Sequence, residues 1–181
     1  TGSICFGRDA AGKTARSGGY GHKIDDEGSG YALGRDALAA VVRAQDGRGP
    51  RTLLTDLVFA QLKVVDVGGL VQFTYDPQTD KKQIAALAPL VARAYEAGDE
   101  AAKAVVEKAC RELALLVEPV ARALHMEDGQ HSAAGQSGAR GYGGAASDAI
   151  SGHAAGGTQK RRRRRRSASG AGNIEYRKRR K

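Results

Sequence analysis

The stretch GGYGHKIDDEGSGY, residues 18–31, separates an apolar segment from a long run with helical periodicity. Its glycines let the backbone approach a ligand closely, so residues 18–30 are predicted to form a ligand-facing loop. The adjacent acids Asp26 and Glu27 have two interpretations. They either belong to a ligand site in this glycine-rich loop, or they are the N-cap and first-turn acid of the helix that follows.

A β-hairpin is predicted upstream of this loop. Residues 3–6 and 14–17 are short strand candidates, and the residues between them are typical of a turn. The segment GRDAAGKT at residues 7–14 also matches the phosphate-loop pattern G-x-x-x-x-G-K-[ST]. A phosphate loop must lead into a helix N-terminus, whereas ARSGGYG follows here. A hairpin turn with an exposed Lys13 is therefore favoured, and a phosphate-loop NTPase that uses residues 7–14 is the alternative.

Residues 31–125 are predicted to be mainly helical, because apolar residues recur there at helical spacing. Asp46-Gly47 is expected to end the first helix, Gly98 to stop the third, and Pro119 to kink the last helix or end it early. Each helix is apolar on one side and needs a surface to pack on. The four apolar stretches cover residues 31–42, 53–62, 84–94 and 105–124.

Residues 127–181 are predicted to be a disordered, basic, low-complexity tail, because they contain few large apolar residues. Residues 160–181 hold 12 of the 29 lysines and arginines and one of the 20 acidic residues, so residues 1–159 are left with a net charge of −2. The basic runs 160–166 and 177–181 are typical of segments that bind nucleic acid without sequence preference. A nucleic-acid-binding protein that acts through this tail is a second alternative. A shifted reading frame would also give such a composition.

Cysteine content and hydropathy indicate the cellular compartment of the protein. Cys5 and Cys110 are the only cysteines, which gives neither a disulfide framework nor a zinc-ligand spacing. No apolar run approaches the roughly 18 residues of a membrane span. We therefore expect a cytoplasmic protein with no membrane contact and no metal held by its side chains. His22 is expected to be a structural hydrogen-bonding residue.

Thr1-Gly2-Ser3 before a strand, a short hairpin, GGYG at residues 18–21 and DEGSG at residues 26–30 form a specific combination. Together they resemble the N-acetylglucosamine kinases and the related BadF/BadG/BcrA/BcrD ATPase family, which shows G-T-G-S followed by G-G-W-G-x-x-x-G-D-E-G-S. The resemblance covers about residues 1–125. It implies an α/β fold, namely part of an actin-like (ribonuclease H-like) ATPase domain over residues 1–126, with an N-terminal β-hairpin followed mostly by helices.

The resemblance also implies which residues bind ligands. Thr1, Gly2 and Ser3 would face the phosphate groups of Mg²⁺-bound ATP, and Ser3 would also reach the sugar. In the sugar-binding loop, Asp26 would accept hydrogen bonds from sugar hydroxyls, and a charged acceptor makes the stronger bond. The other residues implied to contact the sugar are Gly19, Tyr20 and Gly21.

Two loop positions depart from the family pattern. Tyr20 stands where tryptophan is usual, and its ring can still stack on a sugar face. Asp25 stands where glycine is usual and adds a second charge beside Asp26. The sugar affinity of this loop is therefore expected to differ from that of the family.

The implied activity is ATP-dependent phosphorylation of an amino sugar, with N-acetylglucosamine as the expected substrate and a homodimer as the expected assembly of the parent protein. The catalytic base is expected upstream of Thr1, and the adenosine-binding segment after the fourth helix. Because phosphoryl transfer depends on positioning by all of these parts, we expect the 181-residue chain to be a fragment that does not turn over substrate by itself. No catalytic residue is assigned within it.

Overall fold

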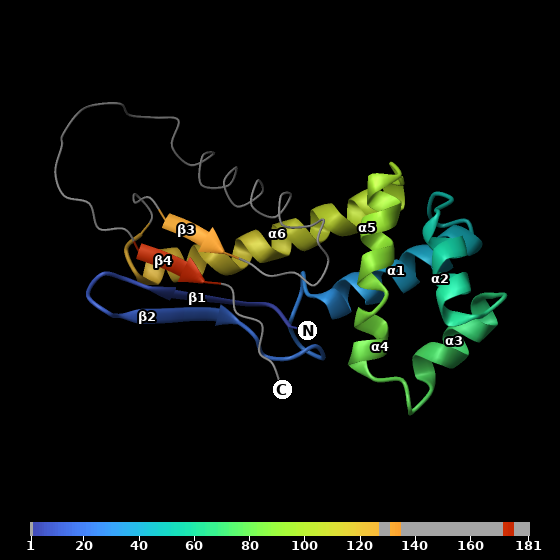
Figure 1. The fold of residues 1–181 in the computed structure, drawn as a ribbon, viewed down its shortest axis with the longest axis horizontal. Coiled ribbons are helices and arrows are strands. Elements are labelled where there is room, and N and C mark those ends of the chain that lie inside the picture. The colour runs from blue at the N-terminus through green and yellow to red at the C-terminus, as the bar shows by residue number, and fades with distance from the viewer. Residues whose placement is uncertain (1, 127–130, 135–171, 176–181) are drawn as a thin grey trace.

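The computed structural model describes residues 2–126, 131–134 and 172–175. A small sheet lies along one half of a long helix, and a group of shorter helices surrounds the other half (Figure 1). The strands are β1 (Ile4–Arg8), β2 (Thr14–Gly18), β3 (His131–Ala134) and β4 (Gly172–Glu175). The helices are α1 (Gly30–Gln45), α2 (Leu54–Leu62), α3 (Val67–Tyr75), α4 (Lys81–Ala85), α5 (Ala88–Glu96) and α6 (Glu100–Ala123).

The predicted hairpin is confirmed. β1 and β2 pair antiparallel, with Cys5 opposite Ser17 and Phe6 opposite Arg16. The turn between them is closed by a hydrogen bond of 2.9 Å, which the Lys13 amide donates to the Asp9 side chain. Since residues 14–18 form a strand and not a helix, the segment 7–14 consists of the end of β1, a turn at residues 9–13 and the first residue of β2. The phosphate-loop alternative is wrong for this reason, because no helix N-terminus follows to hold an anion.

The sheet has the order β2-β1-β4-β3, with β4 antiparallel to β1 and parallel to β3. Both β3 and β4 lie within residues 127–181, where the sequence predicts disorder. At residues 131–134 and 172–175 the structure differs from that prediction. The edge of β1 that does not face β2 offers backbone donors and acceptors that a further strand can satisfy. The rest of the predicted tail, including both basic runs, lies outside the described residues.

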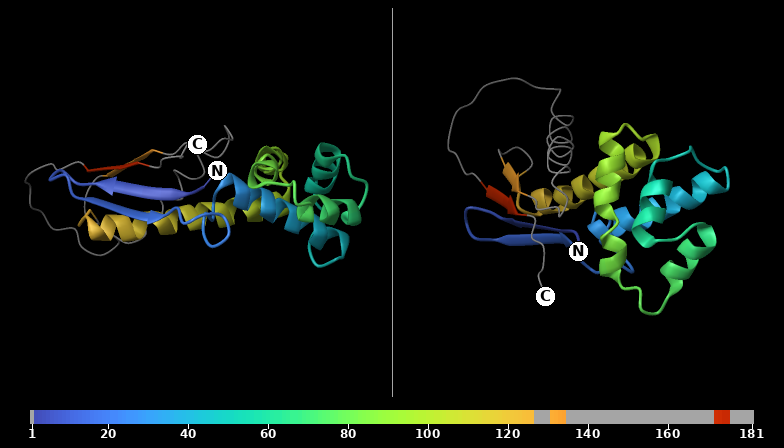
Figure 2. Two further views of the ribbon diagram at one scale, coloured as in Figure 1. Left: turned by 90° about the horizontal axis from the view of Figure 1, so that it is seen from below. Right: turned by 45° about the vertical axis from the view of Figure 1, so that its right-hand side comes forward.

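The hairpin packs on the C-terminal half of α6 (Figure 2). Cys5 is fully buried there against an apolar stripe of α6. Pro119 lies inside α6, and the helix continues past it to Ala123. Of the two effects expected of Pro119, a kink or an early end of the helix, the early end does not occur, because burial of the stripe outweighs one lost backbone hydrogen bond. The stripe and the residues that follow it comprise Val117, Val120, Ala121, Leu124 and Met126.

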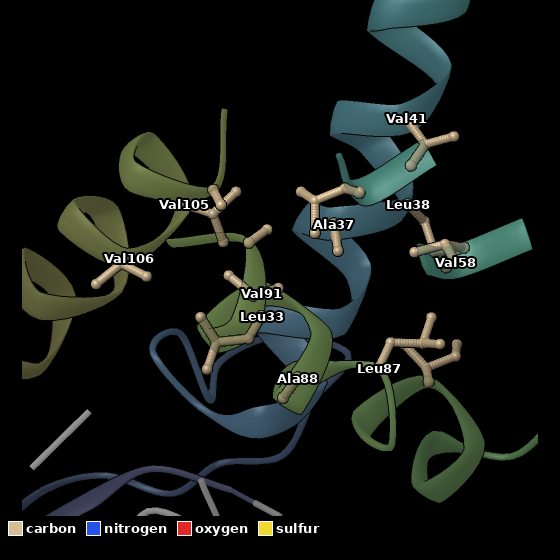
Figure 3. Packing of buried hydrophobic residues seen from close by; sticks show 14 of the residues in the cluster. Leu33, Ala37, Leu38, Val41, Val58, Leu87, Ala88, Val91, Val105 and Val106 are labelled. Carbon is tan, nitrogen blue, oxygen red and sulfur yellow. The ribbon is translucent and has the colours of Figure 1, made fainter. Parts of the chain in front are cut away.

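A second apolar cluster holds the helices together (Figure 3). Val41 of α1, Val58 of α2 and Val91 of α5 are fully buried in it. Gly34 lets α1 cross close to α4, because a Cβ atom at this position would collide with the Ile84 carbonyl. The expected burial of the apolar stripes is confirmed apart from Leu53, which is 46% exposed.

Two helical details differ from the sequence-based expectation. The predicted helix over residues 84–94 is split into α4 and α5, because Pro89 lies in the first turn of α5 and has no amide hydrogen to continue a helix from α4. The helix α3 was not predicted, since Gly68 and Gly69 lower its helix propensity. Asp66 offsets this by accepting the Gly69 amide hydrogen as the N-cap, at 2.8 Å.

Candidate ligand-binding loop

The loop between β2 and α1 is held by a turn at its centre. The carbonyl of Gly21 accepts the amide hydrogens of Ile24 and Asp25, at 3.1 and 2.8 Å. The Asp25 side chain accepts the Tyr20 amide hydrogen at 3.1 Å. Asp25, which replaces the usual glycine, thus has a structural function: it fixes the loop next to Tyr20.

The helix α1 begins with Ser29 as its N-cap. The Ser29 hydroxyl oxygen accepts the Ala32 amide hydrogen at 3.2 Å, and the first turn of α1 contains no acid. Asp26 and Glu27 precede this cap, so the interpretation of these acids as N-cap and first-turn acid is wrong. The serine takes that function because its short side chain reaches the exposed amides of the first turn.

Asp26 lies at a buried and conformationally restricted position. Only 6% of its surface is exposed, and its φ of 67° lies in the left-handed region. Its carboxylate lies against the backbone of Gly2, since a Cβ atom on Gly2 would approach Oδ2 of Asp26 to 2.9 Å. The structure therefore brings together Gly2 from the N-terminal segment and Asp26 from the loop. Their assignment to phosphate and sugar stays a prediction.

Ser3 joins the same two segments. It is buried, and its hydroxyl donates a hydrogen bond of 2.7 Å to the carbonyl of Glu27. A serine has one hydroxyl hydrogen, and here that hydrogen is used within the protein. A phosphate contact at Ser3 would therefore use its backbone amide. Thr1, the third residue of the predicted phosphate segment, lies outside the described residues.

Gly19, Tyr20 and Gly21 lie at the surface end of the loop. Tyr20 is 62% exposed, and the guanidinium carbon of Arg16 lies 5.1 Å from the centre of its ring. A cation at this distance attracts the ring face and limits its motion. Tyr20 is thus an exposed aromatic ring next to Arg16, and its stacking on a sugar stays a prediction.

A network of four charged side chains anchors the loop and was not predicted from the sequence. Arg35 of α1 donates two hydrogen bonds to the Glu27 carboxylate, from Nη1 to Oε1 and from Nη2 to Oε2, each at 2.9 Å. Arg35 also donates from Nε to Asp36 at 3.0 Å. Lys108 of α6 donates to Asp36 at 2.8 Å and lies 3.7 Å from the Glu27 carboxylate.

This network has an electrostatic consequence. The hydrogen bonds from Arg35 hold the pKa of the Glu27 carboxyl below its ordinary value, and the charge of Lys108 acts in the same direction. Hydrogen bonds from Arg35 to Glu27 raise the pKa of the guanidinium in turn. Glu27 is therefore ionised at neutral pH and is paired within the protein. No signal in the sequence pointed to this network of charges. Lys108, for example, is far from the loop along the chain.

Gly28 explains how closely the loop approaches α6. Its φ is 77°, and a Cβ atom at this position would lie 2.6 Å from Cγ of Leu113. Both the conformation and the space require glycine. The loop is thus seated on α6 directly after the two acids.

Two other predicted features can be placed. The ring of His22 packs edge-on against that of Tyr31, with centroids 4.8 Å apart. In the described part of the chain, no group of three or more His, Cys, Asp or Glu side chains is arranged to hold a metal ion. Within the same residues, no helix is long and apolar enough to cross a membrane.

The sequence matches the BadF/BadG/BcrA/BcrD ATPase family over residues 1–162, past the domain boundary predicted at residue 126. The chain is 42% identical over 128 residues to an N-acetylmuramic acid/N-acetylglucosamine kinase of Clostridium acetobutylicum. The matched stretch covers 71% of this chain and 42% of that protein. It is 35% identical over 128 residues to an N-acetyl-D-glucosamine kinase of Dictyostelium discoideum, which covers 70% of this chain and 40% of that protein.

A solved structure from Chromobacterium violaceum, assigned as an N-acetylglucosamine kinase, superposes with a TM-score of 0.65 at 29% identity. The superposition covers 85% of this chain and 50% of that one. The chain thus spans about half the length of this structure and less than half the length of each of the two curated relatives. The predicted fold class, an α/β actin-like ATPase fold that starts with a hairpin and continues with helices, is confirmed. Because the family match covers most of its residues, this chain belongs to the BadF/BadG/BcrA/BcrD ATPase family.

Proposed function

We propose that the whole protein, of which this chain is expected to be a part, transfers the γ-phosphoryl group of ATP to a hydroxyl group of an amino sugar, with N-acetylglucosamine as the substrate. The observation that carries this proposal is the contact between Gly2 and the Asp26 carboxylate. It joins the segment proposed to bind phosphate to the segment proposed to bind sugar. The names of the two curated relatives support the same activity.

In this proposal Asp26 accepts hydrogen bonds from sugar hydroxyls. Its burial strengthens such bonds, since a charged acceptor in a poorly solvated site binds more tightly than in water. Tyr20, steadied by Arg16, stacks on the sugar, and the backbone of Gly19 and Gly21 lines it. The backbone amides of Gly2 and Ser3, together with Thr1, face the phosphate groups.

Magnesium belongs to the proposal as the counter-ion of the nucleotide. No carboxylate cluster for a metal occurs within residues 2–126, so we assign no magnesium ligand among them. When bound, the ion would neutralise charge on the phosphate groups. The side chains described here would contribute the orientation of the sugar.

Three further expectations are part of the proposal. A cytoplasmic location fits the two free cysteines, Cys5 and Cys110, and the use of ATP. A homodimer is proposed by resemblance to the parent family. Non-specific contact with nucleic acid is proposed for the basic runs 160–166 and 177–181, which lie outside the described residues.

The test is a titration of the ¹⁵N-labelled 181-residue chain with N-acetylglucosamine, followed by NMR. We expect the amide signals of Gly19, Gly21 and Asp26 to shift, and Mg-ATP to shift those of Gly2 and Ser3. In the Asp26→Asn variant the sugar affinity should fall by about 10- to 100-fold, because a hydrogen bond to a charged group contributes about 1.5–3 kcal/mol.

The matched control is Asp56→Asn, which alters an exposed aspartate on α2. The helix α2 lies apart from the loop between β2 and α1 (Figure 1), so sugar affinity should stay that of the wild type. An equal loss in both variants, or no sugar-dependent shift in the loop of the wild-type chain, would contradict the proposed function.

A further inference from the structure

Glu27 makes contacts in two directions. Its backbone carbonyl accepts the hydroxyl hydrogen of Ser3 at 2.7 Å. Its carboxylate accepts two hydrogen bonds from Arg35, each at 2.9 Å. A two-point pair between planar groups fixes orientation as well as distance, so Arg35 restrains the Glu27 side chain while Ser3 holds its carbonyl.

The backbone on both sides of Asp26 is therefore fixed. Upstream, the Asp25 amide donates to Gly21 at 2.8 Å. Downstream, Glu27 is held by α1, and the Ser29 amide donates to the Asp26 carbonyl at 3.0 Å. Between these two points Asp26 keeps its left-handed backbone conformation, with φ of 67°.

A loop with this many glycines has high conformational entropy when it is unconstrained. Ordering such a loop at the moment of binding reduces affinity. An anchor formed before the ligand arrives removes that cost. Lys108 strengthens the anchor from a second helix, since it donates to Asp36 at 2.8 Å while Asp36 accepts from Arg35 at 3.0 Å.

We infer that Arg35, supported by Lys108, is a positioning residue for sugar recognition: through Glu27 it holds the Asp26 carboxylate against Gly2. This inference rests on the proposed function. Arg35 itself does not contact the sugar. It acts because the guanidinium pairs with the residue next to Asp26 and thereby keeps the acceptor in place.

The test compares Arg35→Gln and Arg35→Lys with Arg48→Gln in the 181-residue chain. The control removes another arginine–aspartate pair, between Arg48 and Asp46 at 2.7 Å, from the opposite end of α1. Two quantities are measured for each variant. One is the hydrogen-exchange rate of the Ser29 amide, and the other is the affinity for N-acetylglucosamine.

For Arg35→Gln we expect Ser29 exchange to rise and sugar affinity to fall, each by roughly tenfold, as for partners within one hydrogen-bonded network. Arg35→Lys should lie between Arg35→Gln and the wild type, because lysine keeps the charge but not the two-point geometry. Arg48→Gln should match the wild type. The Met126 amide, which donates to Ala121 at 2.9 Å, serves as an internal reference and should not change.

Unchanged Ser29 exchange in Arg35→Gln, or an equal effect of Arg48→Gln, would overturn the inference. A rise in exchange at Met126 as large as at Ser29 would also overturn it, since Arg35 would then support global stability only. If the wild-type chain binds no amino sugar, the proposed function fails. In that case the Ser29 exchange rates still decide whether Arg35 fixes the loop.

Discussion

Gly34 and Gly30 lie on the same helix and show how differently two glycines can be constrained. A Cβ atom on Gly34 would collide with the Ile84 carbonyl of α4. On Gly30 the nearest atom would be Cβ of Ala85 at 3.8 Å, which is ordinary van der Waals contact. The same residue type is thus required at one position of α1 and tolerant at another.

We predict that Gly34→Ala lowers the free energy of unfolding by about 1–3 kcal/mol, the usual cost of overpacking a tight contact. The control, Gly30→Ala, should change it by less than about 1 kcal/mol, with any gain due to the helix propensity of alanine. Urea unfolding followed by helical circular dichroism measures both. Equal stabilities of the two variants would mean that α1 and α4 are not in close contact.

At the scale of elements, the hairpin turn is tied to the end of α6. The Nζ atom of Lys13 donates a hydrogen bond of 2.8 Å to the carbonyl of Ala123, the last residue of α6. A cation at a helix C-terminus also interacts favourably with the helix dipole. The lysine that would hold a nucleotide in a phosphate loop here joins two secondary-structure elements.

For Lys13→Ala we therefore predict unchanged nucleotide binding and a loss of stability of up to about 1 kcal/mol, the usual size of such a helix-end interaction at the surface. Binding is measured with a fluorescent ATP analogue and stability by urea unfolding. Lys103→Ala, at the N-terminal end of α6, is the control and should lose no stability. Loss of nucleotide binding in Lys13→Ala alone would restore the phosphate-loop hypothesis.

At the scale of the whole molecule, the charge network joins the loop to α1 and α6. Its stability depends on pH through Glu27, whose pKa is lowered in the folded protein by Arg35. The folded state then binds fewer protons than the unfolded state between the two pKa values. The stabilisation is present above the unfolded pKa of about 4.3, and it is lost as the pH falls through the lower, folded pKa.

We predict that the wild type exceeds Glu27→Gln in stability by about 1 kcal/mol at neutral pH, a figure reduced for the partial exposure of both partners. This difference should disappear as the pH falls below the ordinary glutamate range. Urea unfolding of both proteins from pH 7 downwards measures it. A difference that stays constant into acid would show that ionisation of Glu27 is not the source.

The sequence by itself was enough to predict the hairpin, the end of α1 near Asp46-Gly47 and the apolar faces of the helices. It also predicted a loop at residues 18–30, and the ligand contact of Asp26 in that loop stays a prediction. These features depend on interactions between residues that are close in sequence, such as turn formation, strand alternation and helical periodicity. Local patterns of this kind are visible in one sequence.

Only the tertiary structure decided how α6 continues through Pro119, and that Glu27 pairs with Arg35 and approaches Lys108. The same holds for the contact of Gly2 with Asp26. The physical reason is that these outcomes depend on which distant segments are packed together. Burial on α6 outweighs a local proline preference, and an ion pair forms only where folding brings its two partners within reach.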